Sequence, residues 1–229
     1  MNAKTLKIAQ YGLLTALALV LGLLDRAIPL SAILSGMVPG IKLGLANTVL
    51  LYAIYLMDWE SAVFLMLAKV LLSGFFFGSL QAIYISLSGG ILSLLVMLIV
   101  RRYPTKGASG AFLLAAAAET VMLARNPHPG GQQLLAVILI GIAMTASAVA
   151  WILIRKGIIR GVPATSIAGG IAHNIGQIIA AVIMLRTPAL FTMYMPGLIG
   201  IGAVVGCLTG IIAERVFRAL HLNPEKSEG

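Results

Sequence analysis

The sequence predicts an all-helical protein that crosses a membrane several times. Of its 229 residues, 60% are hydrophobic and only 10% are charged, whereas a soluble domain carries about 25% charged residues. Its apolar runs approach the roughly 20 residues that a spanning helix needs, and they lack the alternation of a membrane β-barrel. This composition excludes a soluble enzyme, a secreted disulfide scaffold and a disordered chain.

Eight apolar runs are candidate spans, and a ninth segment is too short to cross. Segment 28–38 is apolar, but it is bounded by Pro29 and Pro39, so we expect a loop that folds back into the protein or lies at the interface. Asp25-Arg26 follows the first run where small residues would mark a cleavage site, which predicts a permanent first helix. The candidate spans are 8–24, 39–57, 61–80, 82–100, 108–124, 134–154, 164–185 and 197–213.

The basic residues predict the orientation. With eight spans, eleven Lys and Arg residues fall on one side and three on the other, and cytoplasmic loops are the ones enriched in these residues. We therefore expect a multi-pass protein of the bacterial cytoplasmic (inner) membrane with both termini in the cytoplasm. The larger set is Lys4, Lys7, Arg101, Arg102, Lys106, Arg155, Lys156, Arg160, Arg215, Arg218 and Lys226, and the smaller is Arg26, Arg125 and Arg186.

The same charge bias limits the number of spans. Runs 108–124 and 134–154 must both span or both fail to span, because losing one would move Arg215 and Arg218 to the other side. Six or eight spans satisfy this condition, and seven do not. We expect one integral membrane domain over 1–220, followed by a polar tail over 221–229.

The sequence carries no recognisable catalytic motif. Its closely spaced acids, Asp58/Glu60 and Glu225/Glu228, lie outside the spans, so no aspartate-rich pair can hold magnesium against a diphosphate. Walker A, GxSxG and HExxH motifs are absent from the sequence. We expect a protein that is not an enzyme, with no catalytic residue, metal or cofactor. The net charge of +9 is accounted for by the Lys and Arg residues expected in cytoplasmic loops. We therefore expect no nucleic-acid partner.

Small residues form a stripe on the first helix. Gly12, Ala16, Ala18 and Gly22 follow the small-xxx-small spacing that lets two membrane helices approach closely. The spacing fits either ordinary packing within the bundle or a docking face for a separate membrane subunit.

Polar side chains within the apolar runs are candidate ligand contacts. Lys42 lies near the predicted outer interface, where it either snorkels to water or faces a solute, and Asn47 lies deeper and needs a partner. Lys69 lies near the middle of its run, and an intramembrane charge should face protein or water. Its partner is either Glu119 or an anionic group of a ligand.

A second polar group lies in the run 164–185. His173, Asn174 and Gln177 are spaced to share one sector of a helix that is thinned by glycines at 169, 170 and 176. We expect them to line a ligand surface; the alternative is an internal network that holds helices together. No second His or Cys lies nearby, which disfavours a metal site. Gln81 and Tyr84 are further candidates at the predicted outer end of the run 82–100.

These motifs resemble the Gx transporter family, which is commonly labelled heptaprenyl diphosphate synthase component I. That family is related to the substrate-binding S components of energy-coupling-factor (ECF) transporters. The resemblance covers about 1–104 and 161–217. It rests on Pro39-Gly-Ile-Lys42-Leu-Gly44-Leu-Ala-Asn47, Gly89-Gly90-x-x-Ser93, Gly169-Gly170-x-x-His173-Asn174-x-Gly176-Gln177 and Tyr194-x-Pro196.

The resemblance implies a six-helix core like that of an S component. In the family pattern the Gly-Gly-x-x-Ser helix leads almost directly into the Gly-Gly-x-x-His-Asn helix, so residues of about 105–160 are expected to form an inserted apolar hairpin, giving six to eight spans. The implied function is capture of a vitamin or cofactor-like small molecule from outside, together with a transmembrane coupling subunit and two ATPases.

The resemblance also implies roles for single residues. The solute pocket of such proteins suits Lys42, Gln81, Tyr84, Asn174 and Gln177, and the docking face of the first helix suits Gly12, Ala16 and Gly22. Two other classes stay open: a non-catalytic membrane partner in polyprenyl diphosphate synthesis, and a structural membrane subunit of a larger complex.

Overall fold

The computed structural model describes residues 2–27, 44–77, 80–103, 141, 145, 148–149, 151–187 and 189–222. They form helices, and no β-strand occurs in these ranges, which confirms the all-helical fold class. The helices are α1 (Ala3–Ala27), α3 (Asn47–Leu56), α4 (Trp59–Phe77), α5 (Leu80–Arg102), α8 (Gly161–Leu185) and α9 (Ala189–Ala219).

Five of the described helices are long and apolar enough to cross a membrane. They coincide with the predicted spans 8–24, 61–80, 82–100, 164–185 and 197–213, which confirms a polytopic helical membrane protein. The sixth, α3, has ten residues, fewer than the predicted run 39–57. Segment 28–38, run 108–124 and most of run 134–154 lie outside the described residues, so the inserted hairpin and the total number of spans stay predictions.

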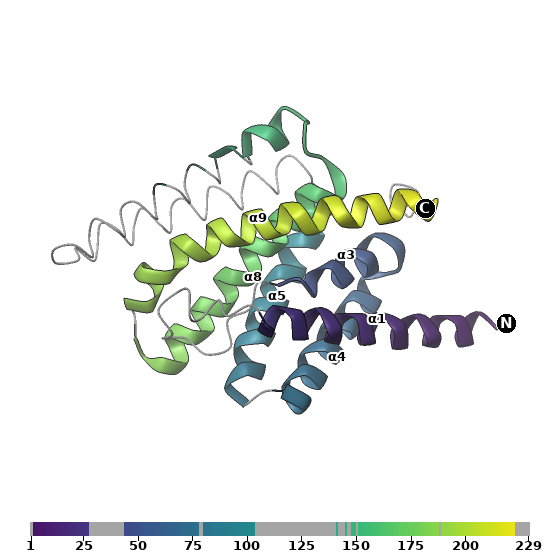
Figure 1. Cartoon of the computed structure of the whole chain (residues 1–229), viewed down its shortest axis with the longest axis horizontal. Helices are drawn as coiled ribbons and strands as arrows, with labels where there is room; N and C mark the ends of the chain where they lie inside the picture. The colour runs from purple at the N-terminus through teal and green to yellow at the C-terminus, as the bar shows by residue number, and fades with distance from the viewer. Residues whose placement is uncertain are drawn as a thin grey trace.

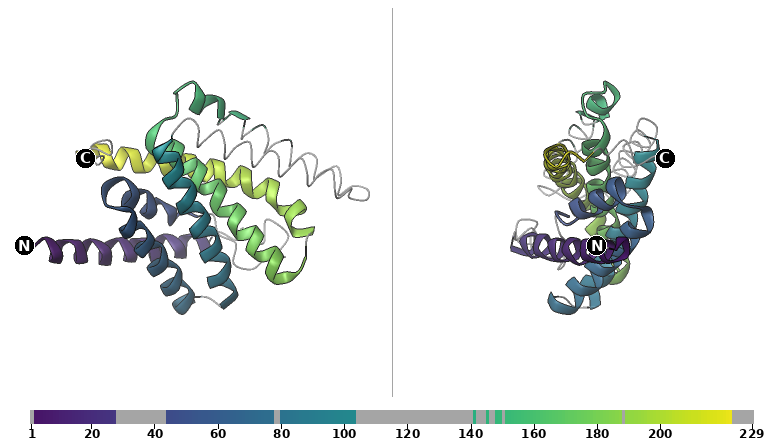
Figure 2. Two further views of the ribbon diagram at one scale, coloured as in Figure 1. Left: turned by 180° about the vertical axis from the view of Figure 1, so that it is seen from behind. Right: turned by 90° about the vertical axis from the view of Figure 1, so that its right-hand side faces the viewer.

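Helix α8 lies at the centre of one half of the molecule. Figures 1 and 2 show it alongside α5 and α9, with α1 and α4 on the far side of α5. Buried apolar side chains of α5, α8 and α9 form one core cluster, and those of α1, α3 and α4 dominate a second. The short helix α3 is enclosed, and Leu50, Leu51 and Ile54 are fully buried.

Glycines let the backbones of α8 and α9 approach closely. A Cβ added at Gly202 would lie 2.8 Å from the carbonyl oxygen of Gly170, and one added at Gly206 would lie 2.7 Å from the carbonyl oxygen of Ser166. A hydrogen bond joins α5 to α8: Ser93 Oγ donates to the carbonyl oxygen of Gly169 at 2.9 Å. Such close approach of small residues is a main source of helix association in membranes.

The basic ends of the helices gather at one end of the bundle. The ribbon places the start of α1 and the end of α9 there (Figure 1). Lys7 of α1 pairs with Asp58 at 2.9 Å, and the Arg101 guanidinium of α5 lies 5.1 Å from the ring centre of Tyr55. We call this the basic end; its cytoplasmic location stays a prediction.

Candidate functional site

A small cavity lies among five structural segments, away from the basic end. It is lined by the second half of α1, the turn before α3, the second half of α4, the first part of α5 and the middle of α8. It has room for about one water molecule. The lining residues are Ala18, Gly22, Asp25, Gly44, Ala46, Lys69, Val70, Ser73, Ser86 and His173.

Lys69 brings a positive charge to this cavity. It lies near the middle of the candidate span Trp59–Phe76, and only 9% of its surface is exposed. Its Nζ donates a hydrogen bond to Oδ1 of Asn47 at 3.2 Å. The structure thus brings together two residues that the sequence singled out separately, whereas Glu119, the expected alternative partner, lies outside the described residues.

Asp25 brings a negative charge to the same cavity, although it was not among the site residues predicted from the sequence. It is 3% exposed, and its Oδ1 accepts a hydrogen bond from the backbone N–H of Leu45 at 3.2 Å. At the end of an apolar run it resembles an ordinary polar flank. Its spacing from Ala18 and Gly22, however, places the three residues on one helical face, and this signal was available in the sequence.

His173 reaches the cavity from α8 and is 3% exposed. Its ring lies where two glycines leave room: a Cβ added at Gly44 would be 3.2 Å from Cδ2, and one added at Gly89 would be 3.0 Å from Nδ1. Gly44 also has a φ of +89°, a conformation that other residues rarely adopt. The turn before α3 and the ring of His173 therefore fit together only with glycine at position 44.

Asn174 and Gln177 face other neighbours. Asn174 Nδ2 donates a hydrogen bond of 2.6 Å to the carbonyl of Leu198 in α9. The Cγ of Gln177 lies 2.8 Å from where a Cβ at Gly89 of α5 would be. Both amides are fully buried, and neither lines the cavity. The three side chains were expected on one surface, but adjacent helical residues point about 100° apart, so Asn174 contacts α9 while His173 faces the cavity.

Of the other predicted site residues in the described part of the chain, Gly22 lines the cavity and Gln81, Tyr84, Gly12 and Ala16 do not. Gln81 and Tyr84 are exposed on α5, Tyr84 by 48%, and Lys42 lies outside the described residues. On α1, Gly12 and Ala16 are exposed, whereas Gly22 is buried and lines the cavity. The predicted docking stripe is therefore divided between two faces of α1.

Buried polar atoms of Asn47 and Ser86 at this site have no hydrogen-bond partner within the described part of the chain. They are Nδ2 of Asn47 and Oγ of Ser86, from residues that are 5% and 6% exposed. A buried unsatisfied polar atom costs about 1–3 kcal/mol, and such atoms are uncommon in native proteins. A bound water or a polar ligand group could donate to or accept from each of them.

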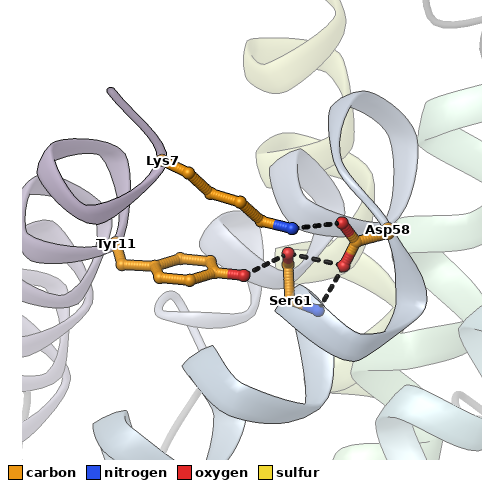
Figure 3. Close-up of polar contacts among 4 residues, drawn as sticks. All are labelled: Lys7, Tyr11, Asp58 and Ser61. Carbon is orange, nitrogen blue, oxygen red and sulfur yellow. Dashed lines mark hydrogen bonds and ion pairs between the residues drawn. The ribbon is translucent and has the colours of Figure 1, made fainter. Parts of the chain in front are cut away.

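A second polar network joins α1 to the start of α4 at the basic end (Figure 3). Lys7 pairs with Asp58 Oδ2 at 2.9 Å, and the hydroxyls of Tyr11 and Ser61 lie 2.7 Å apart. Asp58 Oδ1 accepts hydrogen bonds of 2.6 Å from both the backbone N–H and the hydroxyl of Ser61, which caps the start of α4. Hydrogen bonds from Ser61 and Lys7 lower the pKa of Asp58 from 3.8 to about 2.

No group of three or more His, Cys, Asp or Glu side chains suited to a metal ion occurs among the described residues.

In sequence, the chain matches the profile of the family described as heptaprenyl diphosphate synthase component I, over residues 14–162 and 130–216. No curated protein and no solved structure matches it. The two matched segments together cover most of the chain, which therefore belongs to the heptaprenyl diphosphate synthase component I family.

Proposed function

We propose that this protein is the substrate-binding membrane subunit of an ECF-type transporter and takes up a vitamin or cofactor-like small molecule. The observation that carries the proposal is the cavity, in which charged and polar side chains from α1, α4, α5 and α8 converge inside an apolar bundle. Ionisable residues within a membrane are costly to insert, and they commonly mark the path or the binding site of a solute.

The chemistry of the cavity supports binding by hydrogen bonds. The hydroxyl of the lining residue Ser86 is buried without a partner among the described residues, and so is Nδ2 of Asn47, which lies beside the cavity in contact with Lys69; both groups can donate a hydrogen bond. A solute that binds and leaves would account for polar groups that no fixed neighbour satisfies. The cavity holds about one water molecule, so the helices around it must separate before a larger molecule enters.

The location of the cavity supports entry from outside the cell. Ala18, Gly22 and Asp25 lie in the second half of α1, whose first turns are at the basic end. If the basic end faces the cytoplasm, as the positive-inside rule predicts, the cavity lies in the half of the bundle nearer the outer surface. Lys42, just before the described turn at Gly44, is proposed to lie at its mouth.

The outer face of α1 supports docking of a coupling subunit. Gly12 and Ala16 are exposed there, and no atom of another described segment lies within 4 Å of a Cβ added at Gly12. A second transmembrane helix could therefore approach the α1 backbone closely. The energy for uptake would come from associated ATPases, because this sequence has no Walker A loop of its own.

The family description favours a second candidate, a non-catalytic membrane subunit that assists polyprenyl diphosphate synthesis. A diphosphate bound through magnesium calls for clustered carboxylates, and Asp25 is the one acidic residue among the described cavity-lining side chains. This candidate predicts that a soluble prenyl-transferring partner copurifies with the chain. A purely structural subunit would copurify with neither a solute nor ATPases.

Native mass spectrometry of the protein purified from its own membrane separates these candidates. The proposal predicts a complex with a coupling subunit and two ATPases, and a small molecule released when the protein is denatured. Copurification of a prenyl-transferring enzyme without ATPases would contradict it and favour the second candidate.

A further inference from the structure

Four exposed cations lie where α5 ends and α8 begins. Arg102 is the last residue of α5, and Arg155, Lys156 and Arg160 belong to the segment just before α8. We call these four residues the basic cluster. They lie at the end of one candidate membrane span, in α5, and just before the start of another, in α8. A spanning helix ends where the lipid headgroups begin, so the basic cluster lies at the level of the headgroups.

Tyr55, at the end of α3, shows that the two parts of the basic cluster are neighbours. The guanidinium of Arg101 in α5 lies 5.1 Å from the centre of its ring, and its hydroxyl lies 2.6 Å from Oγ1 of Thr165 in α8. Val100 of α5 and Ile154 of the segment before α8 are buried in one apolar cluster with the start of α8. The end of α5 and the segment before α8 therefore meet at one corner of the bundle.

The Arg160 side chain folds back towards Lys156. A Cβ added at Gly157 would overlap the Arg160 guanidinium, so this group lies against the backbone next to Lys156. Gly157 also has a φ of +70°, which favours glycine. Bringing cations together raises the local positive potential and so favours an anion beside them.

The sequence supplies few acids that could balance the basic cluster. Between Glu60 and Glu214 the chain has one acidic residue, Glu119, which lies within the apolar run 108–124. Glu214 itself forms an ion pair with Arg218 in α9. The basic cluster therefore carries an excess of positive charge, which an anion from outside the chain would balance.

Exposed apolar side chains beside the basic cluster indicate which kind of anion fits. Ile158 is 67% exposed and Tyr103 is 57% exposed, and both are next to or within two residues of the cations. A phospholipid presents an anionic phosphate directly above apolar acyl chains, and clustered Lys and Arg residues at a membrane surface attract such headgroups. A soluble acidic protein would leave these apolar side chains unused.

We propose that the basic cluster binds the phosphate group of an anionic phospholipid in the adjacent leaflet. Arg102, Arg155 and Arg160 donate hydrogen bonds to the phosphate oxygens, and Lys156 adds a point charge. Ile158 contacts the upper part of the acyl chains. The bound lipid holds the segment before α8 against the membrane. This site lies outside the solute cavity, and it does not depend on the proposed function.

Native mass spectrometry of the full-length chain measures the binding. Delipidated protein in a neutral detergent is mixed with phosphatidylglycerol, which is anionic, or with phosphatidylcholine, which is net neutral. The test variant is R155Q/K156Q/R160Q. The matched control removes three cations from exposed positions of α1 and α9 at the basic end. This control is K4Q/R215Q/R218Q.

We expect the wild type to bind phosphatidylglycerol at least about tenfold more tightly than phosphatidylcholine. The test variant should lose about tenfold or more of its affinity for phosphatidylglycerol, and the control should stay within about threefold of the wild type. The preference should decrease between about 0.1 M and about 1 M salt, because the screening length falls from about 10 Å to about 3 Å.

Gly157→Ala tests the arrangement of the cations without removing any charge. The added methyl group displaces the Arg160 guanidinium, so this variant should also bind phosphatidylglycerol more weakly than the wild type. It keeps the test decisive if the triple variant fails to fold.

Three results would overturn the lipid site. Equal weakening in the test variant and the control would show that only net charge matters. Equal affinity of the wild type for the two lipids would remove the preference for an anionic headgroup. Displacement of phosphatidylglycerol by inorganic phosphate at the same concentration would indicate a site for a free anion. None of these results involves the solute or the ATPases, so each leaves the proposed function standing.

Discussion

At the scale of single residues, Asn174 is a buried amide that joins two helices. Its Nδ2 donates to the Leu198 carbonyl at 2.6 Å, and it is fully buried. We expect Asn174→Ala to lower the free energy of unfolding by about 1–3 kcal/mol, because the carbonyl loses a donor in a dry contact. The melting temperature in detergent should fall, while the yield of released small molecule per folded protein should stay at the wild-type level.

The control for Asn174 is Gln81→Ala, which changes an exposed amide on α5 and should leave the melting temperature unchanged. An unchanged melting temperature of Asn174→Ala together with loss of the small molecule would contradict this structural role. It would indicate that Asn174 contacts the solute, as the sequence predicted.

Single residues also show how far sequence reasoning reaches. Lys69, Asn47 and His173 were identifiable because each interrupts an apolar run, and all three lie at or beside the cavity. Asp25 was missed because it ends its run, where a polar residue is ordinary. The separation of Asn174 from His173 depends on which helix packs on each face of α8, and the spacing of the residues does not specify this.

At the scale of helices, close packing of α8 on α9 depends on glycine. A Cβ at Gly206 would lie 2.7 Å from the Ser166 carbonyl oxygen and 2.8 Å from the Ile167 Cα, and backbone atoms cannot move aside cheaply. We expect Gly206→Ala to cost about 1–3 kcal/mol of unfolding free energy, as overpacked sites do, and to lower the melting temperature.

Gly12→Ala is the matched control for this packing. No atom lies within 4 Å of the added Cβ, and alanine is favoured over glycine in a helix by about 1 kcal/mol. The melting temperature of Gly12→Ala should be equal to or above that of the wild type. Equal melting temperatures for Gly206→Ala and Gly12→Ala would show that the α8–α9 contact is looser than described.

Asp58 makes the link between α1 and α4 sensitive to acid. Its pKa is lowered from 3.8 to about 2, so its carboxylate stabilises the folded state above pH 3.8, and this contribution is lost as the pH falls from 3.8 towards 2. We expect the melting temperature of the wild type to exceed that of Asp58→Asn at pH 6, and the two to converge between pH 3.8 and 2. A difference that is independent of pH would contradict this link.

Helix boundaries were predicted less well than helix positions. The run 39–57 is helical only from Asn47 within the described residues, after a turn that Gly44 makes with a φ of +89°. Helix α9 begins at Ala189, eight residues before the predicted run 197–213. An apolar run marks where a chain is stable in lipid, whereas hydrogen bonds and turns determine where its helix starts.

At the scale of the whole molecule, the basic end and the cavity lie in opposite halves of the bundle. The positive-inside rule predicts that the basic end is cytoplasmic. A reporter enzyme that is active only outside the cytoplasm should therefore be inactive when fused to the C-terminus. The same reporter fused after Arg186 should be active. Activity of the C-terminal fusion would show that the number of spans is odd and that the two termini lie on opposite sides of the membrane.

Leucine substitutions at two positions of α1 separate solute binding in the cavity from partner binding on the outer face of the helix. Gly22 lines the cavity and Gly12 is exposed, and no atom of another described segment lies within 4 Å of a Cβ added at either glycine. Native mass spectrometry of Gly22→Leu and Gly12→Leu measures the bound small molecule and the copurifying partner subunits in one experiment. We predict that Gly22→Leu keeps the coupling subunit and ATPases but carries no small molecule, and that Gly12→Leu keeps the small molecule but loses these partners. If both variants keep the small molecule and the partners, the solute does not bind in the cavity and the coupling subunit does not dock on this face of α1.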